Sequence, residues 1–486
     1  MTMMTGREYI ESLRELGPEV YFMGEKVTNV VDEPMFAPHI NTAAMTYELA
    51  HDPLHEEIMT ATSHLTGEKI NRFTHIHQSI DDLVKKIRMM RLLGQKTGTC
   101  FQRCVGLDGL NALYTMTYDI DAKHGTTYHD RFKSFLRYVQ ERDYMSAGAM
   151  TDARGDRSLR PYQQKNRNLY LHISERRDDG IVVNGAKAHI TGAINSHEII
   201  VMPTRAMGEE DKDFALSFAV PVNAKGIKFV FARQTNDSRR LESPLDAGNP
   251  KYACVGGEAL ILFQDVFVPW ERVFMAGEYE FAGALVETFA GHHRANYGGC
   301  KVGLADVVCG GSQWLADAHG LSKASHILDK LTEMVSMAET CWSCSLACSY
   351  EGHKTPSGAY SVNPLLASVT KLNITRMVYE WMRIAQDIAG GKIITLPSES
   401  DMDNPEVGEV VAEYFAGKEG VDVHDILKML RLIESMSIGA GLPEAMHGAG
   451  SPAAQKIIIA RRSGIEKKRA LAETIAGIRK DDTFEK

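Results

Sequence analysis

The stretch GIVVNGAKAHITGA (residues 180–193) decides the fold class of this chain. It mixes β-branched residues with small ones, and Gly and Asn interrupt it, which is typical of strands joined by turns. Short runs of the same kind precede and follow it, at 169–177, 197–206, 214–222, 226–233 and 259–270. Together these runs predict an antiparallel β domain.

On both sides of this β domain the pattern of apolar residues is helical. Near the start of one segment, Ser79 and Asp82 have the spacing of a capping box, and the following residues keep apolar positions at helical intervals. Long segments with the same periodicity fill the last part of the chain. We therefore expect an α+β protein with an N-terminal helical domain (1–148), a middle β domain (149–276) and a C-terminal helical bundle (277–486).

The composition excludes several classes of protein. The 486 residues are 44% hydrophobic and 24% charged, which is ordinary for a globular protein and not for a disordered one. The formal charge of −9 offers no basic face for phosphate contacts, so we expect no nucleic-acid partner. We find no run of about 18 apolar residues and no apolar signal core, so we expect neither a membrane span nor a signal peptide. These features predict a cytoplasmic protein.

Cofactor motifs with a strong local signature are absent from the sequence. No G-x-G-x-x-G follows a predicted strand and no G-x-x-x-x-G-K-[ST] occurs, so a Rossmann nicotinamide site and P-loop chemistry lose their main support. The eight cysteines are too few for a disulfide framework. Their grouping is instead the feature that needs an explanation.

Two groups of cysteines compete as metal ligands. Cys100 and Cys104 are four residues apart, and on a helix they would share one face about 5–6 Å apart at Cβ. Cys341, Cys344 and Cys348 also share a helical face, but a regular helix separates the outer two by about 10 Å. Free Cys on a helix behaves as a small hydrophobe and commonly packs in a core. We therefore interpret the second group as structural.

The segment TFAGHHRANYGGCKVGL (288–304) adds a polar stripe to a predicted helix. Such side chains are poor core material, because each would need a partner when buried. A regular helix would hold the histidine and the cysteine of this stripe about 10 Å apart. We expect Gly298–Gly299 to break the helix and bring them together. The stripe consists of His293, Tyr297, Cys300 and Lys301.

Cys100, Cys104 and Cys300 with one histidine make three thiolates and one imidazole. That donor set suits either a structural zinc ion or an iron–sulfur cluster, and the residues alone leave both open. A neutral imidazole is the more labile ligand, so an iron that carries it is where a substrate oxygen would bind.

Several motifs along the chain carry a resemblance to a known family, among them MTYELA (45–50), LLGQKTGTCFQRCVG (92–106), GAMTDARGDR (148–157), YGGCKVG (297–303) and MHGAGSP (446–452). Through them the chain resembles, nearly end to end, the 4-hydroxybutyryl-CoA dehydratases, within the flavoprotein superfamily of 4-hydroxyphenylacetate 3-monooxygenases and acyl-CoA dehydrogenases. The combination of C-x3-C with H-x6-C is narrow, because the monooxygenase relatives lack the cluster ligands. Much of residues 395–440 departs from the family pattern.

The resemblance implies a bound FAD and a 4Fe–4S cluster held by Cys100, Cys104, His293 and Cys300, in a homotetramer with an acyl-CoA dehydrogenase-like fold. It implies radical dehydration of an acyl-CoA substrate, 4-hydroxybutyryl-CoA, to crotonyl-CoA and water. Isomerisation of vinylacetyl-CoA to crotonyl-CoA and a place in 4-aminobutyrate and succinate fermentation belong to the same expectation. The implied catalytic residues are His293 as ligand or α-proton base, Tyr297, Lys301 and Gln102 as groups that steady the site or the substrate, and Glu258 and Glu444 as acids near the substrate hydroxyl.

Three places are expected to contact the flavin, where backbone amides could approach phosphate oxygens or the ring. The loop before the β domain supplies Met150, Thr151, Asp152, Gly155, Asp156 and Arg157. A strand end supplies Thr191, and a Gly-rich turn supplies Gly448, Gly450 and Ser451.

Two other functions stay open at this point. A flavin-dependent monooxygenase of the 4-hydroxyphenylacetate type would need no iron, and the cysteines would then be incidental. A cluster-bearing redox sensor or assembly scaffold has little support, because the chain offers no nucleic-acid module.

Overall fold

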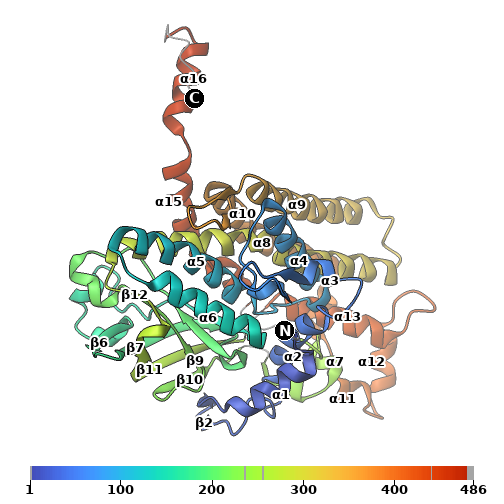
Figure 1. Cartoon of the computed structure of the whole chain (residues 1–486). Coiled ribbons are helices and arrows are strands. Elements are labelled where there is room, and N and C mark those ends of the chain that lie inside the picture. The colour runs from blue at the N-terminus through green and yellow to red at the C-terminus, as the bar shows by residue number, and fades with distance from the viewer. Residues whose placement is uncertain (1–2, 235–236, 254–256, 439–440, 479–486) are drawn as a thin grey trace.

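The computed structural model describes residues 3–234, 237–253, 257–438 and 441–478. It mixes helices with two main β-sheets, and Figure 1 shows the sheets gathered on one side of the molecule with long helices packed across the other. The expected combination of helices and strands is therefore confirmed. Cys254 lies outside the described residues.

Helices form most of the N-terminal and C-terminal parts of the chain. Up to residue 142 they are α1 (Gly6–Leu16), α2 (Ala37–Glu48), α3 (Glu56–Met59), α4 (Ile80–Thr97), α5 (Cys104–His124) and α6 (Tyr128–Arg142). After α7 (Pro244–Ala247) the later helices are α8 (Tyr279–Ala318), α9 (Ser325–Tyr350), α10 (Pro364–Ala389), α11 (Glu399–Met402), α12 (Gly408–Phe415), α13 (Val423–Met436), α14 (Gly441–His447), α15 (Pro452–Arg462) and α16 (Ile465–Ile475). The capping signal of α4 is confirmed, because the Ser79 side chain accepts from the Asp82 N–H at 3.1 Å.

The strands form a six-stranded sheet and a four-stranded sheet. The first has the order β2-β1-β10-β11-β7-β6 and consists of β2 (Glu25–Lys26), β1 (Val20–Phe22), β10 (Ile227–Phe231), β11 (Glu258–Pro269), β7 (Gly180–Thr191) and β6 (His172–Arg176). The second has the order β12-β9-β8-β5 and consists of β12 (Val273–Ala276), β9 (Leu216–Pro221), β8 (Glu198–Val201) and β5 (Ser146–Ala149). Small two-stranded ladders join β3 (Thr60–Thr62) to β4 (Lys69–Asn71) and β13 (His353–Lys354) to β14 (Tyr360–Ser361).

Two strand pairings differ from the expected antiparallel domain. β1 runs parallel to β10, and β5 runs parallel to β8. Parallel neighbours are joined by long connections instead of a hairpin turn, so no local turn signal marks them. β1 is moreover a three-residue strand within the N-terminal helical part, too short for a period-two pattern to reveal it. The antiparallel expectation was wrong at these two pairs.

Helix α8 is the long central helix on which the polar stripe lies, and it runs unbroken through Gly298–Gly299. The expected break was wrong, and the packing explains why. A Cβ on Gly298 would lie 2.4 Å from the Ser345 Cβ of α9, and one on Gly299 would lie 2.6 Å from the Ile87 carbonyl of α4. These glycines therefore allow two neighbouring helices to approach α8 closely, at a cost of about 1 kcal/mol each in helix propensity.

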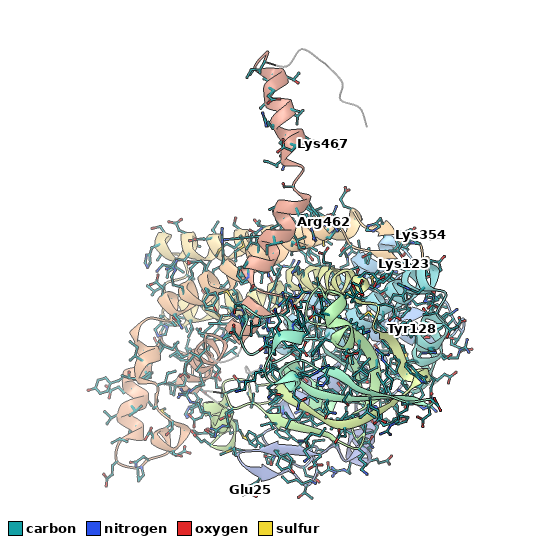
Figure 2. All side chains as sticks on the ribbon, turned by 90° about the vertical axis from the view of Figure 1, so that its left-hand side faces the viewer. Glu25, Lys123, Tyr128, Lys354, Arg462 and Lys467 are labelled. Atoms are coloured by element: carbon teal, nitrogen blue, oxygen red, sulfur yellow. The ribbon has the colours of Figure 1, made fainter. Side chains whose placement is uncertain are left out.

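The C-terminal helix α16 stands away from the body of the chain, as Figures 1 and 2 show from two directions. Several of its large apolar side chains are uncovered, with Ile475 90% exposed and Ile465 61% exposed. Among the described residues, no helix is both long enough and apolar enough to cross a lipid bilayer.

Candidate functional site

The turn between α4 and α5 carries Cys100 and ends at Cys104. α4 stops at Gly98, whose φ of 62° is the left-handed conformation that commonly ends a helix, and α5 begins at Cys104. Cys100 therefore lies in the turn, and the expectation that both cysteines share one helical face was wrong. Gln102 also has a positive φ, 69°, which is uncommon for a residue with a side chain.

Arg103 connects this turn to α2, a role that sequence reasoning missed. Its side chain is buried, its guanidinium lies 3.8 Å from the centre of the Tyr47 ring, and its Nη1 donates to Thr46 Oγ1 at 2.9 Å. Thr46 and Tyr47 belong to the MTYELA motif, so this contact gives that motif a physical role. The sequence signal that could have identified this residue was a single Arg between the two cysteines of the motif.

The three thiols expected as ligands lie within electrostatic reach of one another. Cys104 is buried, whereas Cys100 and Cys300 are partly exposed. Burial is the largest cause of the raised pKa of Cys104, and the neighbouring Cys100 and Cys300 raise it further. Burial also raises the pKa of Cys300, to about 11, although Lys301 opposes the shift.

Tyr297 and Lys301 of the stripe on α8 lie within electrostatic range of these thiols, and His293 packs on Tyr297. His293 is 7% exposed, and its ring stacks on Phe289 with 5.6 Å between centroids and meets Tyr297 edge-on at 5.5 Å. Helix geometry puts His293 and Tyr297 one turn apart on one face, since they are four residues apart. The charge of Cys104 is felt at the Tyr297 hydroxyl. Lys301 lines one cavity with Cys100, whereas the printed contacts of His293 are with Phe289, Tyr297 and Asp108.

Glu444, from α14, contacts Tyr297 and Lys301 of α8. The Tyr297 hydroxyl donates to Glu444 Oε1 at 2.8 Å, and Lys301 Nζ forms a short ion pair with Oε2. Burial opposes ionisation, but Lys301, Lys371 and Tyr297 together outweigh it and lower the pKa of Glu444. Glu444 is therefore an ionised carboxylate held by two donors.

Lys371 of α10 is a second buried cation that sequence reasoning missed. Its side chain is fully buried, its Nζ lies 3.5 Å from the centre of the Tyr297 ring, and it donates to the Ala445 carbonyl. Burial lowers its pKa well below the usual value. A lysine on the buried face of an amphipathic helix was the signal that could have identified it.

Glu258 faces the same region from the sheet. It pairs with Thr191 across β11 and β7, and Thr191 Oγ1 donates to Glu258 Oε1 at 3.4 Å. Its other oxygen, Oε2, is buried and has no hydrogen-bond partner among the described residues. Burial, followed by the charge of Glu444, raises the pKa of Glu258 to about 7.

Gln102 lies at the junction of the turn and the sheet. Its Nε2 is 3.3 Å from the His39 carbonyl, and its Oε1 is buried without a partner in the described part of the chain. A Cβ on Gly192 would lie 3.1 Å from the Gln102 Cβ, so the strand end after Thr191 touches this side chain.

Four of these groups line one small cavity. Cys100, Glu258, Lys301 and Glu444 line its polar side, and Met382 and Leu442 belong to its apolar side. These four polar side chains were all predicted as site residues from the sequence. They come from the α4–α5 turn, β11, α8 and α14. A reacting molecule in this cavity would meet a thiol, a cation and two carboxyl groups.

The loop at 149–157 holds its shape through internal contacts. Asp152 pairs with Lys187 at 2.8 Å and accepts from the Leu171 N–H at 2.9 Å and from Thr204. Met150 offers its carbonyl to Lys187 and Thr204, and Thr151 offers its carbonyl to Ala188. The Asp152 carboxylate is therefore occupied by protein donors, and it shapes the loop.

The outer part of this loop is open to solvent. Gly155 has a φ of 52°, and the Asp156 carboxylate accepts from Ser158. Arg157 is exposed, and its charge is felt at Arg154, whose pKa burial and Arg157 lower.

The Gly-rich turn at 447–452 lies directly on Tyr297. A Cβ on Gly448 would lie 1.8 Å from the Tyr297 hydroxyl oxygen, so only glycine fits there. Gly450 has a φ of 95°, Ser451 precedes α15 as its N-cap residue, and Arg294 Nε donates to the Ala449 carbonyl at 3.0 Å. Two of the three expected flavin segments, the loop and this turn, each bring a residue within electrostatic range of His189 on β7: Arg154 and His447.

No preformed site for a single metal ion is present in the described ranges. There, no three His, Cys, Asp or Glu side chains converge closely enough to hold one ion. A structural zinc needs four ligands at about 2.0–2.3 Å from one point, so this geometry gives no support to the zinc alternative. Cys341 and Cys348 are buried on α9, where their thiols contact Met377 and the Ser345 carbonyl.

Comparison with known proteins identifies the family. Models described as the 4-hydroxyphenylacetate 3-hydroxylase N terminal and C terminal match residues 5–275 and 282–477. The chain is 51% identical to the 4-hydroxybutyryl-CoA dehydratase/vinylacetyl-CoA-Δ-isomerase of Clostridium aminobutyricum, over 98% of this chain and 100% of that protein.

Two solved structures agree with this result. An oxygen-tolerant archaeal 4-hydroxybutyryl-CoA dehydratase from N. maritimus superposes with a TM-score of 0.96 at 48% identity, covering 100% of this chain and 97% of that one. The oxygenase component of 4-hydroxyphenylacetate 3-monooxygenase, solved with FAD, shares the fold with a TM-score of 0.83 at 21% identity, over 98% and 99% of the two chains. The chain belongs to the 4-hydroxyphenylacetate 3-hydroxylase family and, within it, to the 4-hydroxybutyryl-CoA dehydratases.

Proposed function

We propose that this protein dehydrates 4-hydroxybutyryl-CoA to crotonyl-CoA and isomerises vinylacetyl-CoA to crotonyl-CoA. The observation that carries the proposal is the shared cavity in which a thiol, an ionised Glu444–Lys301 pair and a carboxyl group with a raised pKa meet. The 51% identity to a protein that bears both activities in its name supports it over the monooxygenase alternative. No observation favours the sensor or scaffold alternative.

The proposed cofactors are FAD and a 4Fe–4S cluster. The cluster would be held by Cys100, Cys104, Cys300 and His293, and the donor chemistry fits, because three thiols and an imidazole suit iron. Ligands of a cluster bind different irons, so they need not converge on one point. When bound, the flavin supplies one-electron redox chemistry and the cluster supplies a Lewis-acidic iron.

The two carboxyl groups differ in pKa, and one of them is the proposed acid. Their pKa values move in opposite directions, since Glu258 is raised to about 7 whereas Glu444 is lowered. Pairs of carboxyl groups whose environments separate their pKa values in this way assign the acid and the base. We assign Glu258 as the acid, which holds a proton at Oε2 and gives it to the departing hydroxyl so that water leaves. Thr191 fixes its other oxygen.

Tyr297 and Lys301 keep Glu444 ionised and in place beside the substrate. Burial and the neighbouring carboxylate raise the pKa of Tyr297 well above its usual value, so its hydroxyl keeps its proton and remains a donor. Gln102, with a buried and unpartnered Oε1 within the described chain, positions the substrate from the turn. His293 is the fourth ligand or the base that takes the α-proton.

The flavin would lie between the loop 149–157, Thr191 and the turn 447–452. Met150, Thr151, Gly155, Asp156 and Arg157 form the loop side, with Asp152 as its internal anchor. Gly448, Gly450 and Ser451 form the turn side, where backbone amides can approach phosphate oxygens. The FAD in the solved 4-hydroxyphenylacetate relative supports this cofactor.

We further propose an acyl-CoA dehydrogenase-like layout with domains at 1–148, 149–276 and 277–486, assembled as a homotetramer in the cytoplasm. The order of helices, sheets and helices supports the layout. The uncovered apolar side chains of α16 support assembly with further copies. The described cysteines are all unpaired, which fits a reducing compartment.

Anaerobic purification followed by iron, sulfide and flavin analysis tests this function. We expect about four irons and one FAD per chain, and crotonyl-CoA from 4-hydroxybutyryl-CoA without added reductant or nicotinamide. Cys300→Ala should lose iron and turnover, whereas the matched variant Cys341→Ala should keep both. Flavin without iron, together with hydroxylation of a phenol, would replace the proposal with the monooxygenase function.

A further inference from the structure

Asp108 is a fully buried carboxylate in contact with His293. It belongs to none of the sequence motifs above, and the proposed function gives it no role. It lies on α5, four residues after Cys104 and so on the same helical face. Its Oδ2 lies 2.8 Å from His293 Nδ1 and accepts from Asn296 Nδ2 at 2.6 Å. Its Oδ1 accepts from Lys86 Nζ at 2.6 Å.

Lys86 keeps this carboxylate charged. The lysine is itself 0% exposed, and its Nζ also donates to the His292 carbonyl at 3.1 Å, so it ties α4, α5 and α8 together. The two shortest contacts to this carboxylate, Lys86 Nζ to Oδ1 and Asn296 Nδ2 to Oδ2, are both 2.6 Å and both come from nitrogens that only donate. A buried charge pair of this kind is costly unless every oxygen has a donor, and here both oxygens do.

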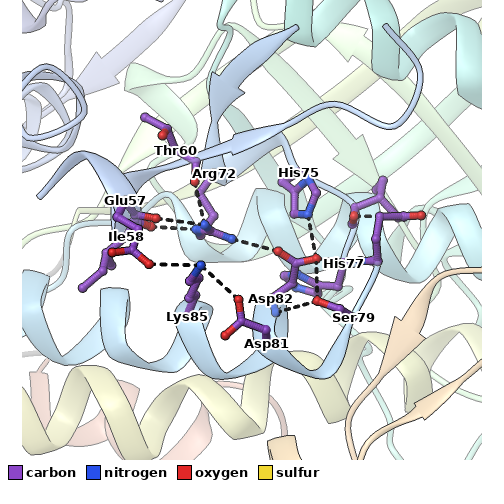
Figure 3. Close-up of polar contacts among 12 residues, drawn as sticks. Glu57, Ile58, Thr60, Arg72, His75, His77, Ser79, Asp81, Asp82 and Lys85 are labelled. Carbon is purple, nitrogen blue, oxygen red and sulfur yellow. Dashed lines mark hydrogen bonds and ion pairs between the residues drawn. The ribbon is translucent and has the colours of Figure 1, made fainter. Parts of the chain in front are cut away.

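The start of α4 fixes the position of Lys86. Asp82, one turn before Lys86, accepts from Arg72 Nη1 at 3.2 Å, pairs with His75 at 3.2 Å and caps the helix with Ser79. Figure 3 shows this network around the first turn of α4. Because Arg72 also donates to the carbonyls of residues 57, 58 and 60, the helix start has little freedom to move.

An ionised carboxylate only accepts hydrogen bonds. The nitrogen of His293 that faces Asp108 must therefore carry a hydrogen, which leaves the lone pair of the neutral ring on Nε2. Phe289 and Tyr297 hold the ring in its plane from two sides. Nε2 is the atom that can bind a metal or take a proton.

We propose that Asp108 is a positioning residue that fixes His293 as the Nδ1–H tautomer, so that Nε2 is available as the cluster ligand or as the α-proton base. Asn296 and Lys86 orient Asp108. This inference rests on the proposed function and adds the group that prepares its most labile ligand. Outer partners of metal-bound histidines typically change metal affinity 10- to 100-fold when removed.

The rate at which iron is lost to an excess of a ferrous chelator, followed by absorbance under anaerobic conditions, tests this inference without turnover. Asp108→Asn, in the reconstituted holoenzyme, is expected to release one iron about 10- to 100-fold faster than wild type. Adding Asp108→Asn to His293→Ala should change the release rate less than about twofold, because the histidine through which Asp108 acts is already absent. Glu198→Gln, which alters a buried carboxylate paired with Arg272 in the four-stranded sheet, is the matched control and should release iron at the wild-type rate.

Three results would overturn the inference. Iron release at the wild-type rate from Asp108→Asn would remove the positioning role and leave the proposed function intact. A full additional effect in the His293→Ala background would show that Asp108 acts on the fold and not through the histidine. Wild-type protein that takes up no iron would overturn the proposed function itself. If Asp108→Asn gives too little folded protein, Asn296→Ala removes one donor to the same oxygen, and an unchanged release rate there would count equally against the inference.

Discussion

Gly448→Ala tests how closely the turn 447–452 is packed on Tyr297. The added Cβ would lie 1.8 Å from the Tyr297 hydroxyl oxygen, whereas an ordinary contact needs about 3.5 Å. The hydroxyl must therefore retreat by about 1.7 Å, which breaks its 2.8 Å bond to Glu444. A hydrogen bond to a charged group contributes about 1.5–3 kcal/mol. If the bond acts fully in the transition state, kcat/KM falls about 10- to 150-fold.

The assay is kcat/KM for 4-hydroxybutyryl-CoA beside a thermal unfolding scan. Overpacking should also lower the free energy of unfolding by about 1–3 kcal/mol. Gly310→Ala is the matched control, because a Cβ there meets nothing within 4 Å inside α8. In a Tyr297→Phe background the clash with the hydroxyl is gone, so Gly448→Ala should cost much less activity. Wild-type kcat/KM and stability in Gly448→Ala would refute the packing argument.

Three further outcomes are expected. Glu258→Gln should lower kcat about 10²- to 10⁴-fold. In wild type, activity should fall as the pH rises through about 7, because Glu258 loses the proton that it donates. This decrease at high pH should be missing from the pH–rate profile of the variant. Gly299→Ala should destabilise the protein by about 1–3 kcal/mol in urea unfolding, because its Cβ would lie 2.6 Å from the Ile87 carbonyl; equal stability of Gly299→Ala and wild type would contradict the role of this glycine in packing α4 on α8. Ending the chain after Arg462 should preserve the circular dichroism spectrum and reduce the mass measured by light scattering, since the apolar side chains of α16 are uncovered; an unchanged mass would exclude α16 from assembly.

The two carboxyl groups show why the site had to be examined in three dimensions. Glu258 and Glu444 are far apart in the sequence, and each reads there as an ordinary surface residue. Burial and then the charge of Glu444 raise the pKa of Glu258, whereas Lys301 and its neighbouring donors lower the pKa of Glu444 in spite of burial. Only a folded chain that brings β11, α8 and α14 to one cavity creates this difference.

Local signals predicted local features well. The Ser79 capping signal and the β-rich texture around 180–193 depend on neighbouring residues, and both are found where they were expected. The parallel pairing of β1 with β10 depends on contacts between residues about 200 positions apart, for which the sequence has no local marker.

The prediction from local sequence that failed most clearly concerns the glycines of α8. The physical cause of this failure also affects the geometry of the site. Gly298–Gly299 was expected to break α8 because glycine is flexible, yet the residues that decide the outcome are Ser345 of α9 and Ile87 of α4, which fill the space a Cβ would need. The same holds at Gly94, where a Cβ would meet the Cys300 carbonyl at 2.5 Å. Close packing of α4 on α8 therefore positions Cys300 relative to the turn of Cys100. The spacing of cysteines within each motif does not set this geometry, so a variant that preserves every cysteine but enlarges one of these glycines should still weaken the site.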